Sequence, residues 1–257
     1  MAKAATKIAG VRKGRGARRN AAGATKPLYA QVEEIIRQRL IDNYWNPGDA
    51  LPSEIQLAAE LGVSQGTVRK ALNDMVAENL LVRHQGRGTF VSEHTERRAL
   101  FLFFNLVGED GSRTMPVSRV LSCEHRKATT EERAQLELAA GAEVITVRRV
   151  RSLHGEPVIV DRVTVSRVLF PGLGSDVELP ENLYHFYQGK YGVTIAKAQE
   201  RVRAVSATAE EAKLLGLEDG APLLEIDRIS LTLDARPVEW RVSRCNTDRH
   251  TYVAERG

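Results

Sequence analysis

The chain has 257 residues, of which 42% are hydrophobic and 27% are charged, and its formal net charge is +4. This length is typical of two domains with tails, and the composition is that of an ordinary water-soluble globular protein. The longest apolar run, residues 99–104, is too short to cross a bilayer. The N-terminus lacks the apolar stretch of a signal peptide, and the two cysteines have no metal-binding or redox spacing. We therefore expect a cytoplasmic protein with no membrane span, no metal and no cofactor.

The positive charge is concentrated at the N-terminus. Residues 1–26 contain eight lysines or arginines and no acidic residue, so the rest of the chain, with 29 basic and 33 acidic residues, is mildly acidic. Because this segment is rich in alanine, glycine, lysine and arginine, it cannot bury apolar surface, and we expect a disordered tail. Such a tail either adds salt-sensitive contacts to nucleic-acid phosphates or only keeps the chain soluble.

Residues 27–92 contain the signals of three helices. In the first helix, apolar residues recur at intervals of three and four and define one face: Leu28, Val32, Ile35, Ile36 and Leu40. Ser53 and Gln56 form a capping box that begins a second helix, and Gly62 ends it. Ser64 then caps a third helix, whose inward positions are Val68, Ala71, Leu72, Met75 and Val76. A helix, a glycine turn and a second helix occur both in ordinary helical bundles and in DNA-binding domains.

A polar hairpin follows the third helix. Residues 80–82 and 89–91 have the composition of two short strands, and the residues between them, 83–88, are basic and polar and include two glycines. Glycines at a hairpin tip let the backbone approach a phosphate or a groove, because no Cβ is in the way. Together with the helix pair, this hairpin predicts a winged helix-turn-helix DNA-binding domain over residues 27–92.

This domain resembles the winged helix of the GntR family of regulators. The family pattern is matched by Leu28-Tyr29, Pro47-Gly48, Leu51-Pro52-Ser53-Glu54, Leu57-Ala58, Val63-Ser64, Thr67-Val68-Arg69, Ala71-Leu72 and Gly86-Arg87-Gly88-Thr89-Phe90-Val91. The resemblance implies that the start of the third helix reads base edges in the major groove while the hairpin tip reaches the minor groove. The DNA contacts that it implies are Ser64, Gln65, Gly66, Thr67, Arg69 and Lys70 in the helix and Gln85, Gly86 and Arg87 in the hairpin.

Two positions of the domain depart from the family pattern, and several have simpler explanations. Many family members carry arginine where this chain has Ile55 and Gln65. Because arginine usually reads guanine and glutamine adenine, the bases opposite Gln65 are not expected to follow the family's commonest palindrome. A role as a cap, a filler or a solvated helix face also fits Ser64, Thr67, Arg69 and Lys70.

After a charged link over residues 93–100, the chain contains an internal repeat. Residues 101–106 and 116–121 first have the composition of strands. A shift of 79 residues then aligns Ala128-Thr129-Thr130-Glu131-Glu132 with Ala207-Thr208-Ala209-Glu210-Glu211, and Gly141-Ala142 with Gly220-Ala221. Each copy predicts a threonine-capped helix, a glycine turn and a hairpin. Two copies predict a pseudo-symmetric α+β domain over residues 101–254, in which both hairpins join one antiparallel sheet that helices cover on one side.

The same segment resembles the UTRA ligand-binding domain that accompanies this winged helix in the HutC branch of the GntR family. The likeness is carried by Arg149-Val150-Arg151, Gly155-Glu156-Pro157, Leu169-Phe170-Pro171-Gly172-Leu173, Leu183-Tyr184, Tyr191-Gly192 and Pro237-Val238-Glu239. The resemblance implies a chorismate-lyase-like fold, which binds a metabolite in a cleft and couples this binding to the release of DNA. It also implies that the domain takes part in dimerisation.

The repeat separates residues that both halves share from residues that one half has alone. The correspondences at polar positions are Arg149 with Arg228, Arg151 with Ser230, Asp161 with Arg241 and Glu239 with Ile159. Strand alternation places Arg149 and Arg151 in an otherwise apolar row, where they need anionic partners if the row is buried. They either pair with Asp161 or Glu239, or clamp a carboxylate or phosphate of a ligand. The UTRA resemblance favours effector contacts by Arg149, Arg151, Asp161, Glu239 and Arg241.

These features predict a one-component transcription regulator. We expect a homodimeric repressor that a small anionic metabolite releases from a palindromic operator. An enzyme is an alternative from another class, because Asp161, His185 and His250 could be acid–base groups, but the sequence has no nucleophile motif, metal cluster or phosphate loop. A second alternative is an architectural DNA-binding protein whose second domain only dimerises.

Overall fold

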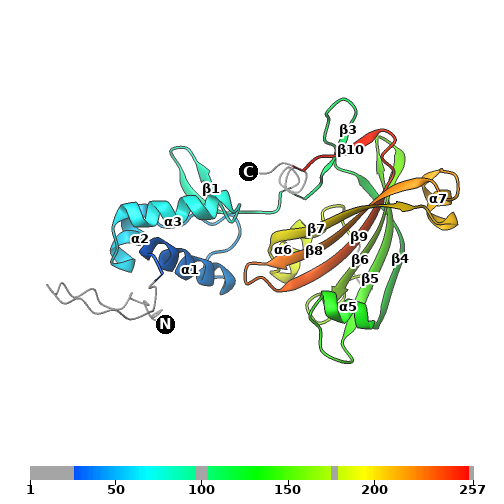
Figure 1. Cartoon of the computed structure of the whole chain (residues 1–257). Coiled ribbons are helices and arrows are strands. Elements are labelled where there is room, and N and C mark those ends of the chain that lie inside the picture. Colours follow the sequence, from blue (N-terminus) through cyan, green and yellow to red (C-terminus); the bar gives the residue numbers. More distant parts are fainter. Residues whose placement is uncertain (1–25, 96–102, 175–178, 255–257) are drawn as a thin grey trace, which may run out of the picture. The chain divides into compact units, whose positions relative to one another are not determined.

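The computed structural model describes residues 26–95, 103–174 and 179–254. The chain divides into two compact units, residues 1–92 and 93–257, and each is described by itself (Figure 1). The predicted disordered tail lies outside the described residues except for Lys26, and so do residues 96–100 of the predicted link. Along the described part of the chain, no helix is long and apolar enough to cross a membrane.

The first unit has the predicted helices and hairpin, namely α1 (Leu28–Ile41), α2 (Glu54–Leu61), α3 (Gln65–Ala77), β1 (Leu81–His84) and β2 (Gly88–Val91). The capping box at the start of α2 is confirmed: the Ser53 side chain accepts from the backbone N–H of Gln56, and the Gln56 side chain accepts from the backbone N–H of Ser53. Gly62 ends α2 in the left-handed conformation, at φ 69°. The Ser64 side chain accepts from the backbone N–H of Thr67 and so begins α3.

One apolar core holds these elements together. Its most deeply buried side chains are Val32, Ile36, Leu57, Leu61, Val68, Ala71, Leu72, Met75 and Leu81. The predicted inner face of α1 is wrong at Leu28, which is 43% exposed because it is the first residue of the helix and lies beyond the core. Since α3 turns its apolar residues toward the core, its polar residues are left on the surface.

The second unit is built on a six-stranded antiparallel sheet with the order β4-β5-β6-β9-β8-β7. Its strands are β4 (Val117–Lys127), β5 (Glu143–Leu153), β6 (Glu156–Ser166), β7 (Ile195–Ser206), β8 (Pro222–Thr232) and β9 (Pro237–Cys245). A separate two-stranded pairing joins β3 (Leu106–Gly108) and β10 (His250–Tyr252). The strand expected over residues 101–106 is wrong for residues 103–105, and residues 101 and 102 lie outside the described residues. Phe103 and Phe104 do not join a strand. Their carbonyl oxygens accept hydrogen bonds from arginine side chains, those of Arg228 and Arg113, instead of joining a ladder.

The predicted repeat is visible in both halves of the sheet. α5 (Thr130–Gln135) precedes β5 and β6, and α7 (Ala209–Leu215) precedes β8 and β9. Both helices begin with a capping box of the same kind, formed by Thr129 and Glu132 in one half and by Thr208 and Glu211 in the other. The strands β4, β5 and β6 therefore follow one another from one edge of the sheet, just as β7, β8 and β9 do from the other edge.

The two halves meet along β6 and β9, and we call this pairing the seam. It runs from Ile159, opposite Cys245, to Val165, opposite Glu239, so its partners are 74 to 86 positions apart in the sequence. Within one half, by contrast, β5 and β6 are joined by a tight turn at His154-Gly155, where both residues have positive φ.

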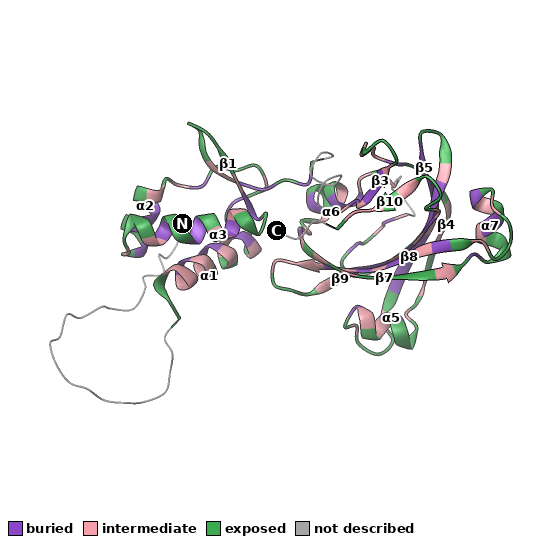
Figure 2. Ribbon diagram, turned by 45° about the horizontal axis from the view of Figure 1, so that its top comes forward, coloured by how far each residue is buried: buried purple, intermediate pink, exposed green. Residues whose placement is uncertain are grey.

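Helices cover both faces of the sheet. On one face, buried residues of α7 pack with those of β5 and β6: Val150, Val160, Ala212 and Leu215. On the opposite face lies α6 (Leu183–Tyr191), which packs on Ile145, Val147, Val163 and Val165. Figure 2 shows the buried residues following the strands. The expectation of helices on one side holds for α5 and α7 but is wrong for α6, because α6 belongs to the segment between the two copies and the repeat does not include it.

Candidate DNA-binding surface and effector site

The exposed face of α3 carries four of the nine residues predicted to contact DNA: Gln65, Gly66, Arg69 and Lys70. The surface is open at Gly66, where the nearest atom to an added Cβ is Ser64 Oγ, at 3.8 Å. Ser64 and Thr67 complete the helix cap instead, since the Thr67 N–H donates to Ser64 Oγ at 3.2 Å and the two hydroxyl oxygens lie 2.9 Å apart. The cap explanation therefore accounts for Ser64 and Thr67 without any DNA contact.

A single carboxylate, that of Glu54 at the start of α2, joins the elements of this surface. It accepts hydrogen bonds from Arg69 Nε at 2.9 Å and from Gln65 Nε2 at 3.2 Å, both on α3, and from Arg83 Nη2 on β1 at 3.0 Å. Burial acts to raise the pKa of Glu54, but these donors outweigh it and the pKa is lowered. The sequence prediction of DNA contacts missed Glu54, although it belongs to the motif that carried the family resemblance.

Lys70 is paired on the surface of α3. Its Nζ lies 3.0 Å from Asp74 Oδ2, one turn further along the helix, and 4.2 Å from the centre of the Tyr29 ring. The hydrogen bond with Asp74 is the main cause of a raised pKa of Lys70. This arrangement favours a solvated helix face at Lys70.

The tip of the hairpin is unobstructed. Gly86 and Gly88 have positive φ, 70° and 114°, and a Cβ added at either position would meet nothing within 4 Å. Gln85 and Arg87 are exposed beside them, and the guanidinium carbon of Arg87 lies 5.8 Å from the centre of the Phe90 ring. A backbone without side-chain obstruction and with a basic neighbour suits a groove or a phosphate.

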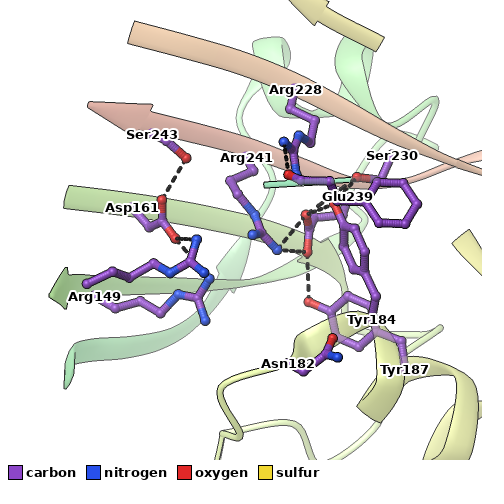
Figure 3. A network of polar contacts seen from close by, with 12 residues as sticks. Arg149, Asp161, Asn182, Tyr184, Tyr187, Arg228, Ser230, Glu239, Arg241 and Ser243 are labelled. Carbon is purple, nitrogen blue, oxygen red and sulfur yellow. Dashed lines mark hydrogen bonds and ion pairs between the residues drawn. The ribbon is translucent and has the colours of Figure 1, made fainter. Parts of the chain in front are cut away.

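On the face of the sheet that packs on α6, buried charged side chains interrupt the apolar core (Figure 3). Arg149 Nη2 donates to Asp161 Oδ2 at 2.8 Å, and Ser243 Oγ donates to Asp161 Oδ1 at 2.6 Å. Arg151 Nη1 lies farther from the same carboxylate, 3.6 Å from Oδ2. Burial acts to raise the pKa of Asp161, but the charges of Arg149 and Arg151 outweigh it and the pKa is lowered. The Asp161 carboxylate is therefore the anionic partner of both Arg149 and Arg151.

Glu239, which is fully buried on β9, forms a second centre of the network. It accepts hydrogen bonds from Arg241 Nη2 at 2.9 Å and from the hydroxyls of Tyr187 at 3.0 Å and Tyr184 at 3.2 Å. The Tyr184 hydroxyl also lies 2.7 Å from Ser230 Oγ. Burial, followed by the charge of Glu239, raises the pKa of Tyr187 well above its usual value, so this hydroxyl remains a donor. Because both tyrosines belong to α6, Glu239 ties α6 to the sheet.

A hollow of about 340 Å³, counting its open mouth, lies beside these two centres. It is lined by Phe103, Phe104, Met115, Arg151, Glu181, Asn182, Leu183, Tyr184, Arg228 and Arg241. Of the five predicted effector residues, Arg151 and Arg241 are in the lining, whereas Arg149, Asp161 and Glu239 are not. Sequence reasoning missed Arg228, which it noted only as the counterpart of Arg149 in the repeat. It also gave no role to Tyr184, although the UTRA resemblance quoted this residue.

Among the described residues around the hollow, buried cations outnumber buried anions. The buried cations are Arg149, Arg151, Arg228 and Arg241, and the buried anions are Asp161 and Glu239. The partly exposed Glu200 pairs with Arg228, and the exposed Glu181 is in the lining of the hollow. Arg151 shares its anion with Arg149, and its Nε has no hydrogen-bond partner. Burial lowers the pKa of Arg151 to about 9, because Asp161 only partly offsets the loss of solvent and the charge of Arg149 adds repulsion. Arg151 is thus the guanidinium that an external anion would stabilise most directly.

An open recognition helix and hairpin, together with a second unit that has a charged hollow, define a DNA-binding transcription regulator with an effector domain. Residues 28–91 match the gntR family of bacterial regulatory proteins, and residues 112–251 match the UTRA domain. The chain belongs to the GntR family, in the branch with a UTRA domain. The predicted family and α+β fold class are thereby confirmed.

Several relatives are named as repressors. The chain is 31% identical to the mannosyl-D-glycerate transport/metabolism system repressor MngR of Escherichia coli, over 90% of this chain and 97% of the relative. It is 33% identical to the histidine utilization repressor of Pseudomonas putida, over 79% of this chain and 81% of the relative. The crystal structure of PhnF from Mycobacterium smegmatis, at 22% identity and a TM-score of 0.53, covers 88% of this chain and 99% of PhnF and shows the same fold.

Proposed function

We propose that this regulator is a repressor that acts as a cytoplasmic homodimer on a palindromic operator and is released from it by a small anionic metabolite. The observation that carries the proposal is Arg151, a buried arginine in the wall of the hollow, whose carboxylate partner Asp161 lies 3.6 Å away and is shared with Arg149. The repressor role is supported by the names of the relatives, which concern the use of particular metabolites. A two-fold dimer is expected because a single winged helix reads few bases.

The chemistry of the hollow favours a ligand with a carboxylate or a phosphate. The guanidinium fork of Arg151 is suited to bind two oxygens of such a group, and Arg241 lies in the same lining. A bound anion would relieve the burial of the Arg151 charge, which now lowers the pKa of this group to about 9. In this proposal, Arg149, Asp161 and Glu239 position the lining residues, and the apolar part of the metabolite packs on Phe103, Phe104 and Tyr184.

We propose no catalytic activity for this chain. The Asp161 carboxylate is hydrogen-bonded by Arg149 and Ser243, so it is not free to exchange a proton with a substrate. His185 is exposed, and the described residues contain no group of three or more His, Cys, Asp or Glu side chains that could hold a metal ion. An effector site explains the hollow without further chemistry.

The Arg151→Ala variant tests the proposed effector site. It should keep its operator affinity, because Arg151 belongs to the second unit. It should need about 10- to 100-fold more metabolite for release, since a hydrogen bond to a charged group contributes about 1.5–3 kcal/mol. The measurement is a titration of metabolite against a preformed operator complex. A thermal-shift screen of carboxylates, phosphate esters and neutral sugars identifies the metabolite, because binding at 100 times Kd adds about 2.7 kcal/mol of stability.

Arg201→Ala is the matched control, since Arg201 is an exposed arginine of the same unit, on β7. This variant should release DNA at the metabolite concentration that releases the wild type. If Arg151→Ala also does so and only melts at a lower temperature, Arg151 merely pairs with Asp161 and the proposed site is wrong. Stabilisation by neutral sugars alone would reject the anionic metabolite.

A further inference from the structure

Glu54 lies where α2, α3 and the hairpin meet. Its side chain is only 18% exposed, and both carboxylate oxygens are used: Oε2 accepts from Gln65 and Arg69, and Oε1 accepts from Arg83. An uncompensated carboxylate at a DNA-facing surface would repel phosphates, but the two arginines compensate this charge. The same contacts fix the orientation of the side chains that donate to Glu54.

The hydrogen bond to Glu54 determines which end of the Gln65 amide faces outward. An ionised carboxylate only accepts hydrogen bonds, so the NH2 group of the amide must face Glu54 Oε2, at 3.2 Å. The carbonyl oxygen, Gln65 Oε1, must then point away from Glu54. Gln65 therefore presents an acceptor, together with the second N–H of its amide, to whatever approaches α3.

We propose that Glu54 is a positioning residue that sets the base preference of Gln65, so that the base opposite Gln65 must donate a hydrogen bond. This inference rests on the proposed role of α3 in reading operator bases. In the major groove, the exocyclic amines of adenine and cytosine donate, whereas guanine presents only the acceptors N7 and O6. Adenine is favoured because its N7 also accepts the second N–H of the Gln65 amide. Gly66 leaves room for the base edge, since a Cβ there would meet only Ser64 Oγ, at 3.8 Å.

Arg69 is oriented by the same carboxylate, but it affects the overall affinity for DNA and not the base preference. Its Nε donates to Glu54 Oε2 at 2.9 Å, which leaves both terminal nitrogens for a phosphate or a base. Loss of Glu54 therefore changes the overall affinity through Arg69 and the base preference through Gln65. A test of the proposal must measure the ratio of affinities for two bases at one position, because this ratio is independent of the phosphate contacts.

Selection from a random duplex library with the full-length protein comes first, and the wild type should enrich a palindrome. This duplex then competes with versions in which guanine is substituted at one position at a time. The relative affinities for the two duplexes are measured for wild type, Gln65→Met and Glu54→Gln. The wild type should prefer adenine over guanine by about 10-fold at one position of each half-site, and Gln65→Met should lose the preference there. Glu54→Gln should lose most of the same preference, because a glutamine at position 54 also donates and lets the Gln65 amide rotate.

Glu60→Gln is the control, since Glu60 lies on the same helix, pairs with Arg39 and does not contact α3 through a hydrogen bond. It removes the same charge and should keep the adenine preference. If thermal melting shows that Glu54→Gln is unfolded, Glu54→Asp replaces it. The shorter side chain of Glu54→Asp cannot reach Gln65, so this variant should also lose the adenine preference. Retention of the preference by the Glu54 variants, or by Gln65→Met, would overturn the proposal. Failure of the wild type to enrich any sequence would instead reject the proposed function.

Discussion

Asp161 is the anion for two buried guanidinium groups, so its removal would leave both without a carboxylate. Asp161→Asn should lower the free energy of unfolding by about 3–5 kcal/mol, the usual cost of breaking a buried ion pair from one side. Urea denaturation measures this loss. Glu210→Gln, which breaks the surface pair of Glu210 with Arg148, should cost about 0–1 kcal/mol. Equal, small losses in both variants would show that Asp161 does not compensate the arginines.

The stability that Asp161 contributes should depend on pH in one direction. Its pKa is lowered from 3.8 in the folded protein, so the folded state favours the ionised form. The contribution is therefore fully present above about pH 4 and is lost as the pH falls through the folded pKa. The difference in unfolding free energy between wild type and Asp161→Asn should be constant from pH 7 to pH 5 and should shrink below pH 4. A difference that already shrinks between pH 7 and pH 5 would contradict the lowered pKa.

Residues of the proposed effector site differ in how far the sequence predicts them. Strand alternation placed Arg149 and Arg151 in one buried row, because a period of two follows directly from strand geometry. Comparison of the repeats set Arg228 aside, yet Arg228 lines the hollow, paired with Glu200 of the neighbouring strand. Glu200 lies 28 positions before Arg228, and local sequence does not show such a partnership across two strands. Tyr184 was overlooked for a related reason, since its partner Glu239 lies 55 positions away.

Helices with a closed set of local hydrogen bonds are the elements that the sequence predicts best. α2, α5 and α7 each begin with a capping box, in which a cap and a residue three positions further on satisfy one another. α6 was not predicted as a helix, although Asn182 caps it by accepting from the backbone N–H of His185. It lacks both the box and a counterpart in the repeat, and its packing face is fixed by Glu239 and other residues of the sheet.

The role of Ser64 as the N-cap of α3 can be tested separately from the role of the exposed α3 surface in DNA binding. Ser64→Ala should lower the free energy of unfolding by about 0.5–2 kcal/mol, because the Thr67 N–H loses its acceptor, whereas Ser64→Gly should cost only about a few tenths of a kcal/mol. Chemical denaturation of the two variants checks the difference. A loss of similar size in both variants, or in neither, would show that Ser64 does not act as an N-cap.

For the whole molecule, the repeat predicts the two halves of the sheet but not how they join. Each half consists of three strands that follow one another in the chain and pair with their neighbours in sequence. The seam between β6 and β9 pairs residues 74 to 86 positions apart, and β6, which is buried along most of its length, has a sequence that is equally compatible with other neighbours. The order of distant strands depends on complementary surfaces that only the folded halves present.

The seam also has a kinetic consequence. Strands within each half meet by closing tight turns or the short segments that contain α5 and α7, but the pairing between the halves joins residues at least 74 positions apart, and loop-closure entropy makes such pairings slow. Val163→Ala, at a buried seam position opposite Arg241, should therefore slow refolding, with a φ-value above about 0.5. Leu215→Ala, at the last residue of α7, which packs with Val150 and Val160, should mainly accelerate unfolding. Stopped-flow refolding and unfolding of the two variants measure these rates, and the opposite assignment would mean that the core of α7 forms before β6 and β9 pair.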